Sequence, residues 1–406
     1  MKEGKLLRRI KKELEGKRRR GSLADFISAK WERGRVGVYL KQNVTDFASW
    51  DVVGLRDSKN FLKEVHKNYY KTRLIPPSPR LVLGTDEAHL LVEKKLAAFL
   101  RQEEAVLFTS KNQAVLTLFS ALVREGDLVV FDEKHQSPLF DAAYLVGAET
   151  AFFKAKDPLS LEKTLSLHLE RSKREEREVF VFAESVSPFY ARKINIALIE
   201  QICTKTGANL IIDETYALGW YGIRGAGITA ESLNERQSLI AIYGDLSLAF
   251  CTPFSFVAGS KELVSYLINR SSIFKGESAP QIFNILLLNS ALDNVELAVG
   301  AREKAASYSK LLWDSAVKEG WASLPQENLP FITVEVEKKK LLFDLKKAFL
   351  ERGFLIAFAN QISAAGEHYY LQIVVSASHK EEQIRRLLSA LAEINTHIKE
   401  GLIKVS

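Results

Sequence analysis

The sequence predicts an α/β protein in which a large domain with a mainly parallel sheet is followed by a smaller α+β domain. Between about residues 80 and 290, short and nearly continuous apolar runs alternate with helical patterns. Such runs are typical of strands that helices cover on both faces. After about residue 290 the pattern changes to longer helices. We therefore expect an N-terminal arm over residues 1–50, the large domain over 51–290 and the small domain over 291–406.

Six apolar runs are the expected strands of the large domain. In chain order they cover residues 105–110, 127–133, 178–185, 209–214, 239–244 and 254–260. Ligands of parallel sheets bind beyond the carboxyl ends of the strands. This rule selects five short segments as the candidate site, namely residues 109–112, 133–137, 184–188, 213–216 and 245–248.

The small domain is expected to mix helices and strands. A helical stretch over residues 291–318 leads to "FITVEVE", then to a helix that ends at Gly353. The apolar run "YYLQIVVSAS" and a last helix, "EEQIRRLLSALAEI", complete the chain's regular elements. No internal repeat is evident in the sequence.

The basic charge of the protein is concentrated at its N-terminus. The 406 residues include 57 Lys and Arg against 50 Asp and Glu. Ten of the basic and three of the acidic residues lie in residues 1–22, so the remaining chain balances at 47 against 47. The folded body therefore gives no electrostatic argument for a nucleic-acid partner.

Leu6, Leu7, Ile10 and Leu14 recur at helical spacing within this basic segment. The pattern predicts an amphipathic helix. We favour packing of this helix on a dimer mate, and contact of residues 1–22 with an anionic membrane surface is the alternative.

Cysteine usage and hydropathy indicate a cytoplasmic protein. Cys203 and Cys251 are the two cysteines, and they form no metal-binding or disulfide motif. No apolar run approaches the roughly 18 residues of a membrane-spanning helix. The basic N-terminus has no apolar stretch behind it, so we expect no secretory signal.

Motifs over most of the chain resemble the α-oxoamine synthases. "PRLVLGTDEAHLLVEKKLAAFL" (residues 79–100) and "VAGSKEL" (residues 257–263) carry the resemblance, which extends from Asp46 to His379. Members such as 8-amino-7-oxononanoate synthase and serine palmitoyltransferase are fold-type I pyridoxal phosphate (PLP) enzymes that join an acyl-CoA to an amino acid. The resemblance implies an aspartate aminotransferase-like fold with a seven-stranded, mainly parallel sheet, and PLP as the cofactor.

Three positions of the family's cofactor site keep a suitable side chain. The resemblance places His135, in "EKHQS", where a family histidine stacks on the cofactor ring. It places Asp213, in "IIDETY", where an aspartate pairs with the protonated ring nitrogen. Tyr216 stands where the family has a histidine that binds the phenolic oxygen, and a phenol can also donate that bond.

The segment "GDLSLAFC" departs from the family at its central position. The family sequence Thr-Leu-Ser-Lys-Ala-Phe aligns without a gap, so Leu248 follows Ser247 at the Schiff-base lysine position. An isobutyl group supplies neither the covalent anchor nor the base, and we expect it to fill space left by the cofactor. Asp245 replaces a phosphate-binding threonine. A carboxylate there would repel the phosphate by up to about 4 kcal/mol at about 4 Å.

Other cofactor and substrate positions also differ. Lys111 and Asn112 stand in the family's phosphate loop, and Lys275 lies beside Gly276, where the neighbouring subunit lends a phosphate-binding threonine. Gln372 replaces the arginine that clamps the substrate carboxylate, which removes a bidentate ion pair. We expect Lys111 and Lys275 to face the former phosphate site.

Three functions follow from these observations. The first is a degenerate homologue of the acyl-CoA transferases without PLP catalysis, as a homodimer or as the partner of a lysine-bearing paralogue. The second is an active PLP-dependent acyl-CoA transferase, 8-amino-7-oxononanoate synthase-like, with a non-standard site. The third is a binding protein that holds another anionic ligand in the old pocket. We expect no metal site.

Overall fold

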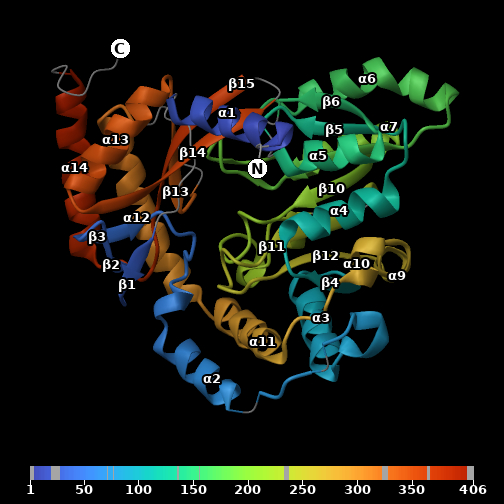
Figure 1. Ribbon diagram of the computed structural model, residues 1–406, viewed down its shortest axis with the longest axis horizontal. Helices are drawn as coiled ribbons and strands as arrows, with labels where there is room; N and C mark the ends of the chain where they lie inside the picture. The colour runs from blue at the N-terminus through green and yellow to red at the C-terminus, as the bar shows by residue number, and fades with distance from the viewer. Residues whose placement is uncertain are drawn as a thin grey trace.

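The described residues of the computed structural model form two large sheets, joined through a shared hydrophobic core, and a two-stranded sheet of β8 (Val186–Ser187) and β9 (Arg192–Lys193) (Figure 1). The structure describes residues 4–19, 28–70, 72–75, 77–134, 137–154, 156–232, 237–321, 328–363 and 366–399. The larger sheet lies on the right of Figure 1 and the smaller one on the left.

The larger sheet has seven strands and is mostly parallel, as the sequence predicts. Its order is β4 (Glu104–Phe108), β12 (Ser255–Gly259), β11 (Leu239–Asp245), β10 (Asn209–Asp213), β7 (Val179–Glu184), β5 (Leu128–Asp132) and β6 (Glu149–Phe153). Only β12 among them runs antiparallel to its neighbours, β11 and β4. Asp213 is in register with Glu184 on one side and with Tyr243 on the other.

Helices bury both faces of this sheet. Alternate side chains of β7 belong to different clusters, because Phe180 and Phe182 pack with one and Val179 and Val181 with the other. The Phe182 cluster includes side chains of α4 (Lys111–Leu122), α5 (Ser137–Val146) and α9 (Lys261–Arg270). The Val181 cluster includes side chains of α3 (Glu87–Phe99), α6 (Leu159–Arg174), α7 (Ile196–Thr206) and α11 (Ile282–Glu296). Burial on both faces explains why the strands are apolar throughout.

The smaller sheet combines strands from both ends of the chain. Its order is β1 (Ala29–Trp31), β2 (Val36–Tyr39), β3 (Gln42–Phe47), β14 (Phe354–Ser363), β15 (Gly366–Val374) and β13 (Phe331–Val336). Helices α12 (Val299–Lys318), α13 (Lys339–Glu351) and α14 (Glu381–Lys399) pack beside it. Our domain boundaries stay a prediction, but residues 29–47, which we assigned to the arm, form three strands of this sheet.

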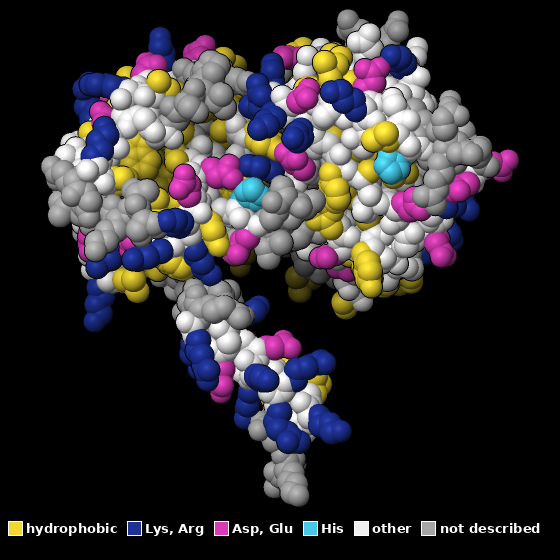
Figure 2. Space-filling model, turned by 90° about the horizontal axis from the view of Figure 1, so that it is seen from above, with side chains coloured by type: hydrophobic (Ala, Val, Ile, Leu, Met, Phe, Trp, Pro, Cys, Tyr) yellow, Lys and Arg dark blue, Asp and Glu magenta, His cyan; other side chains and the backbone are white. Residues whose placement is uncertain are grey.

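The remaining elements are short, apart from α1 (Lys5–Arg19) and α2 (Lys59–Tyr69). They are η1 (Leu55–Asp57), η2 (Arg80–Gly84), η3 (Ile223–Gly225), α8 (Thr229–Ser232), α10 (Ser272–Gly276), β8 (Val186–Ser187) and β9 (Arg192–Lys193). Helix α1 extends away from the body of the protein, as the space-filling view shows (Figure 2). In the described part of the chain, a membrane-spanning length of apolar helix is reached only by α11 and α12 taken together, which meet at 68°.

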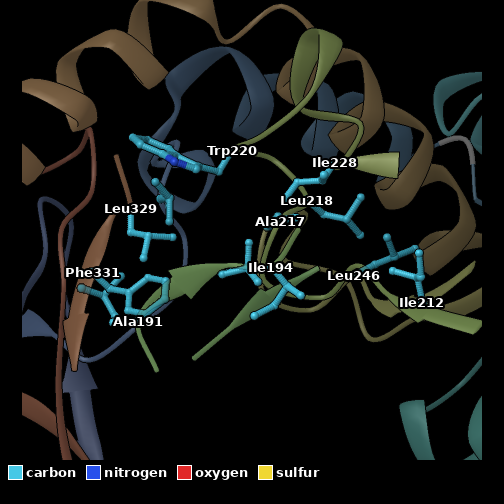
Figure 3. Packing of buried hydrophobic residues seen from close by; sticks show 14 of the residues in the cluster. Ala191, Ile194, Ile212, Ala217, Leu218, Trp220, Ile228, Leu246, Leu329 and Phe331 are labelled. Atoms are coloured by element: carbon cyan, nitrogen blue, oxygen red, sulfur yellow. The ribbon is translucent and has the colours of Figure 1, made fainter. Parts of the chain in front are cut away.

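Hydrophobic side chains from both sheets meet between the domains (Figure 3). Leu329 and Phe331, at the start of β13, lie in the same cluster as Trp220, Ala191 and Ile194 of the large domain. The Trp220 indole also donates a hydrogen bond of 2.7 Å to the Asn328 carbonyl. The two domains are therefore packed together through side chains of their own.

His379 links β3 to the turn before α14, and its environment favours the neutral imidazole. The ring stacks on Phe47 at 4.1 Å between centroids. Nε2 lies 2.8 Å from the Asp46 carbonyl, and Nδ1 accepts a hydrogen bond of 3.0 Å from the Ser376 amide. Burial, followed by the nearby Arg35 guanidinium, lowers the pKa of His379 from 6.5 to about 4.

We expect acid to destabilise the protein through His379. Its pKa is lower in the folded state, so the stabilisation is complete above about pH 6.5 and is lost as the pH falls towards 4. A shift of this size corresponds to about 3 kcal/mol. Urea unfolding at several pH values should show the loss in the wild type and a flatter profile in His379→Gln. Equal slopes for the two proteins would contradict this assignment, and His66→Gln, on the exposed α2, is the matched control.

Candidate functional site

Acidic side chains gather at the carboxyl edge of the seven-stranded sheet, where the sequence predicts the site. Asp132, Glu184, Asp213 and Asp245 are the last residues of β5, β7, β10 and β11. The first three are buried and Asp245 is half-buried. A buried group of carboxylates requires either protons or a cation to remain in a folded protein.

Lys111 supplies the cation. It is the first residue of α4, after Ser110, whose hydroxyl caps the helix by accepting from the Gln113 amide at 3.3 Å. From there its Nζ reaches the Asp213 Oδ2 at 2.5 Å, with side-chain exposures of 18% for Lys111 and 1% for Asp213. The ammonium also lies 5.9 Å from the centre of the Tyr243 ring.

The second carboxylate oxygen of Asp213 accepts hydrogen bonds from Thr215, two residues further along the chain. Oδ1 accepts from the Thr215 amide at 2.9 Å and from the Thr215 hydroxyl at 2.5 Å. The Thr215 hydroxyl in turn accepts from the Asp245 amide at 3.1 Å. Both oxygens of the predicted cofactor-binding carboxylate are therefore engaged by groups of this chain.

The charges of the site reinforce this pairing. Burial lowers the pKa of Lys111, but the Asp213 carboxylate, with smaller contributions from Tyr216 and Glu184, raises it above its ordinary value. Lys111 is thus an ammonium group at neutral pH. A protonated amine has no lone pair with which to attack a carbonyl group, so this arrangement disfavours Lys111 as a substitute for a Schiff-base lysine.

The same surroundings favour the neutral form of Glu184, whereas they favour the charged form of Lys111. Burial, followed by the Asp213 and Asp132 carboxylates, raises its pKa well above the usual range. Burial, then Asp213 and Glu184, likewise raises the pKa of the Tyr243 phenol. The centre of the site therefore holds one ammonium among three carboxyl groups and carries no surplus positive charge.

Asp245 turns its carboxylate towards the loop that follows it. Oδ1 accepts a hydrogen bond of 2.8 Å from the Ser247 amide. Ser247 itself is exposed. In the described residues no hydrogen bond or ion pair joins Asp245 to Lys275, which lies exposed on α10. Lys275 therefore does not compensate the charge of Asp245 through a direct contact.

The Leu248 side chain is half-buried at the turn that follows β11. The turn after β11 is anchored by Leu246 and Phe250, which are fully buried, whereas Leu248 is half-buried. Figure 3 shows Leu246 beside Ile212 and near Leu218 in the core. The side chain that lies against Asp213 is Lys111, and the expectation that Leu248 fills space left by the cofactor stays a prediction.

The remaining predicted residues are distributed around the site. Tyr216 is half-buried and packs on Trp50 with ring centres 4.7 Å apart. Asn112 is exposed in the first turn of α4. His135 lies outside the described residues.

Gln372, on β15, joins the two domains. Its side chain is 7% exposed, and Nε2 donates to the Pro188 carbonyl at 2.9 Å and to the Thr333 hydroxyl at 3.3 Å. The Thr333 hydroxyl donates to the same carbonyl at 2.6 Å. The amide at the predicted substrate clamp is therefore engaged with the loop that follows β7.

Sequence reasoning missed Thr215, Glu184 and Tyr243 as members of the site. Glu184 and Thr215 fall within the strand-end segments that we selected, but we gave neither a role. Tyr243 looked like an ordinary apolar strand residue, and its place beside Asp213 comes from the register of β10 with β11.

The fold is that of the fold-type I PLP enzymes. The chain belongs to the aminotransferase class I and II family, whose model matches residues 73–391. It is a distant homologue of 8-amino-7-oxononanoate synthases. It is 27% identical over 359 residues to a putative 8-amino-7-oxononanoate synthase of Aquifex aeolicus, covering 87% of this chain and 93% of that protein. Identity to the 8-amino-7-oxononanoate synthase of Thioalkalivibrio sulfidiphilus is 26%, over 95% of this chain and 97% of that protein.

Solved structures agree on the fold. The serine palmitoyltransferase of Sphingomonas wittichii has a TM-score of 0.84 at 19% identity, covering 97% of this chain and 98% of that chain. The 8-amino-7-oxononanoate synthase of Francisella tularensis has a TM-score of 0.72 at 16% identity, covering 87% and 98%. The aspartate aminotransferase-like architecture predicted from the motifs is thereby confirmed.

The residues present do not fit PLP. In the enzymes that this chain resembles, an aspartate carboxylate pairs with the protonated ring nitrogen of PLP. Here the Asp213 carboxylate already bonds to an ammonium and to Thr215. Binding of the ring would require Lys111 to leave this buried ion pair, which would leave a charged group without its partner.

We expect the ion pair to matter for stability. Lys111→Met should lower the free energy of unfolding by about 3 kcal/mol because it leaves Asp213 buried and unpaired. Lys111→Met combined with Asp213→Asn should recover part of this loss, which chemical denaturation of all four proteins would measure as a coupling energy. Lys163→Met, on the exposed face of α6, is the matched control. Additive effects of the two substitutions would contradict the pairing.

Proposed function

We propose that this protein is a non-catalytic homologue of the acyl-CoA:amino acid acyltransferases that acts as a dimeric scaffold or partner subunit. The observation that carries the proposal is the ion pair between Lys111 and Asp213. It supplies from within the chain the positive charge that the cofactor ring nitrogen would bring. The cytoplasmic location of the protein stays a prediction.

A second argument comes from the amines available at the site. Leu248, at the position that aligns with the Schiff-base lysine, has no amine. The Lys111 amine is protonated and held by Asp213. Neither side chain supports covalent binding of PLP or proton transfer at a substrate α-carbon.

The same geometry disfavours the two alternative functions. An active acyl-CoA transferase would need a reactive amine or another base, and Lys111 does not supply one. An anionic ligand would need uncompensated positive charge in the old pocket. Lys111 is compensated by Asp213, and Lys275 lies exposed on α10. A charge-neutralised scaffold agrees better with these contacts than either alternative.

The test is a PLP titration followed by borohydride reduction and peptide mapping. We expect no adduct in the wild type after gel filtration. Leu248→Lys should give a weak adduct at position 248, because Lys111 still occupies Asp213. Leu248→Lys with Lys111→Gly should bind at least tenfold more tightly, since the carboxylate is then free. Leu248→Met with Lys111→Gly is the control without an added amine.

Asp245→Thr tests whether PLP binding is opposed mainly by Lys111, which occupies Asp213, or by the Asp245 carboxylate, which would repel the phosphate. Because the Asp245 carboxylate already accepts from the Ser247 amide, adding Asp245→Thr should improve binding less than adding Lys111→Gly does. A wild-type adduct that persists through gel filtration, or release of CoA from an acyl-CoA and an amino acid, would refute the proposal.

The scaffold role also requires a surface for a second subunit. Helix η2, the start of α3 and the segment before them expose large apolar side chains at 52–84% of their area. They are Tyr69, Tyr70, Leu74, Leu81, Val82, Leu83, Leu90 and Leu91. Large exposed apolar side chains gathered on a protein surface mark interaction sites, and we assign these residues to contact with a second copy of this chain.

Charge on this surface should separate the subunits. We expect Leu83→Glu to elute as a monomer and the wild type as a dimer in size-exclusion chromatography with light scattering. Leu297→Glu, an equally drastic change at an exposed leucine elsewhere, should remain dimeric. A monomeric wild type would contradict the homodimer, and recovery of a complex only on co-expression with a lysine-bearing paralogue would favour the heterodimer instead.

A further inference from the structure

Helix α1 presents an apolar side that the protein itself leaves uncovered. Leu6, Leu7, Ile10 and Leu14 are 60%, 48%, 41% and 46% exposed, and α1 contains no buried residue. At 3.6 residues per turn, these four side chains fall within an arc of about 100°. The apolar positions therefore form a continuous stripe along the helix.

The rest of the helix surface is strongly basic. Eight of the fifteen residues are Lys or Arg and two are Glu, both of which face an arginine four residues away. Basic side chains flank the apolar stripe on both sides, because Arg9 and Lys5 lie beyond one border and Lys11 and Arg18 beyond the other. The helix thus combines an apolar face with a net charge of six positive units.

The position of α1 leaves this surface accessible. In the space-filling view the helix extends outward from the body, with its Lys and Arg side chains on the surface (Figure 2). An isolated helix of about 15 residues is only marginally stable in water. A surface that covers the apolar stripe would stabilise it.

We propose that α1 lies on an anionic phospholipid surface, with its apolar stripe in the interface and its basic side chains against the lipid headgroups. A short helix with these two faces is typical of interfacial membrane binding. Juxtamembrane Lys and Arg are attracted to acidic lipids within a Debye length of the surface. This inference is independent of the proposed loss of catalysis.

Charge complementarity favours a lipid surface over the other occupants. A nucleic acid would neutralise the basic side chains but leave the apolar stripe exposed to water. A second copy of this chain offers no negative surplus, because the sequence beyond residue 22 holds 47 basic and 47 acidic residues. An acidic bilayer provides both negative charge and an apolar phase.

The experiment is flotation of the full-length protein with vesicles. We expect binding to vesicles of 70% phosphatidylcholine and 30% phosphatidylglycerol, and at least tenfold weaker binding to pure phosphatidylcholine. Raising the salt from 0.1 to 0.5 M should weaken binding several-fold, because the Debye length shortens.

Two sets of variants separate the contributions of the faces. Leu7→Asn with Ile10→Asn removes apolar contact and should lower binding at least tenfold. Arg8→Gln with Lys12→Gln leaves the stripe intact and should also lower it at least tenfold, at about fivefold per charge. Leu167→Asn with Lys163→Gln on α6 is the control, since Leu167 is 81% exposed, and it should bind as the wild type does.

Three outcomes would overturn the proposal. The first is equal binding to neutral and acidic vesicles, or none to either. The second is unchanged vesicle binding of Leu7→Asn with Ile10→Asn, because binding would then depend on charge alone and not on the apolar stripe. The third is a pair of results: the wild type is a dimer that does not bind vesicles, and the same variants are monomers. This result would assign the apolar stripe to contact with a second copy of the chain.

Discussion

The buried carboxylate at the end of β10 is the constraint on which the site depends. Asp213 is placed by the register of three strands in an environment that excludes water. A carboxylate there must be neutralised, and the cost of leaving it alone amounts to several kcal/mol. In the enzymes that this chain resembles, the cofactor ring supplies the positive partner. Here the Lys111 ammonium is the positive partner. A ligand with a protonated ring would therefore have to displace Lys111 from the Asp213 carboxylate.

The Lys111 ammonium is also the positive charge that the neighbouring carboxyl groups share. Glu184 lies near Asp213 and Asp132, and its raised pKa favours the protonated form. A protonated Glu184 limits the negative charge that Lys111 must balance. The pocket of an enzyme for phosphate-bearing ligands needs an excess of cations or backbone donors. The cluster at this sheet edge offers no such excess, because Lys111 is already paired with Asp213.

The sequence predicted the sheet well because its strands are buried on both faces and are therefore apolar without interruption. It also predicted Asp213, because a polar residue that ends such a strand lies at the site edge. The direction of Lys111 could not be predicted. The resemblance placed Lys111 in the family's phosphate loop, whereas the structure shows that its long side chain reaches the Asp213 carboxylate at the end of β10. The direction of Asp245 was missed because an aspartate that caps its own turn has the same sequence signature as one that faces a ligand. Residues 29–47 form three short strands, and their place in the smaller sheet depends on pairing with β14, which lies near the other end of the chain.

A fold that works without PLP, as we propose for this protein, must replace the stability that the ligand confers. Ligand present at a hundred to a thousand times its dissociation constant stabilises the native state by about 3–4 kcal/mol. In this protein the contacts between the domains are made by the chain itself. Gln372 and Thr333 bond to the Pro188 carbonyl, and Trp220 bonds to the Asn328 carbonyl. Together with the pair of Lys111 and Asp213, these hydrogen bonds join the elements that a bound cofactor and substrate would otherwise hold together. A scaffold of this kind can keep one arrangement of its domains at all times, which is the property that a partner subunit requires.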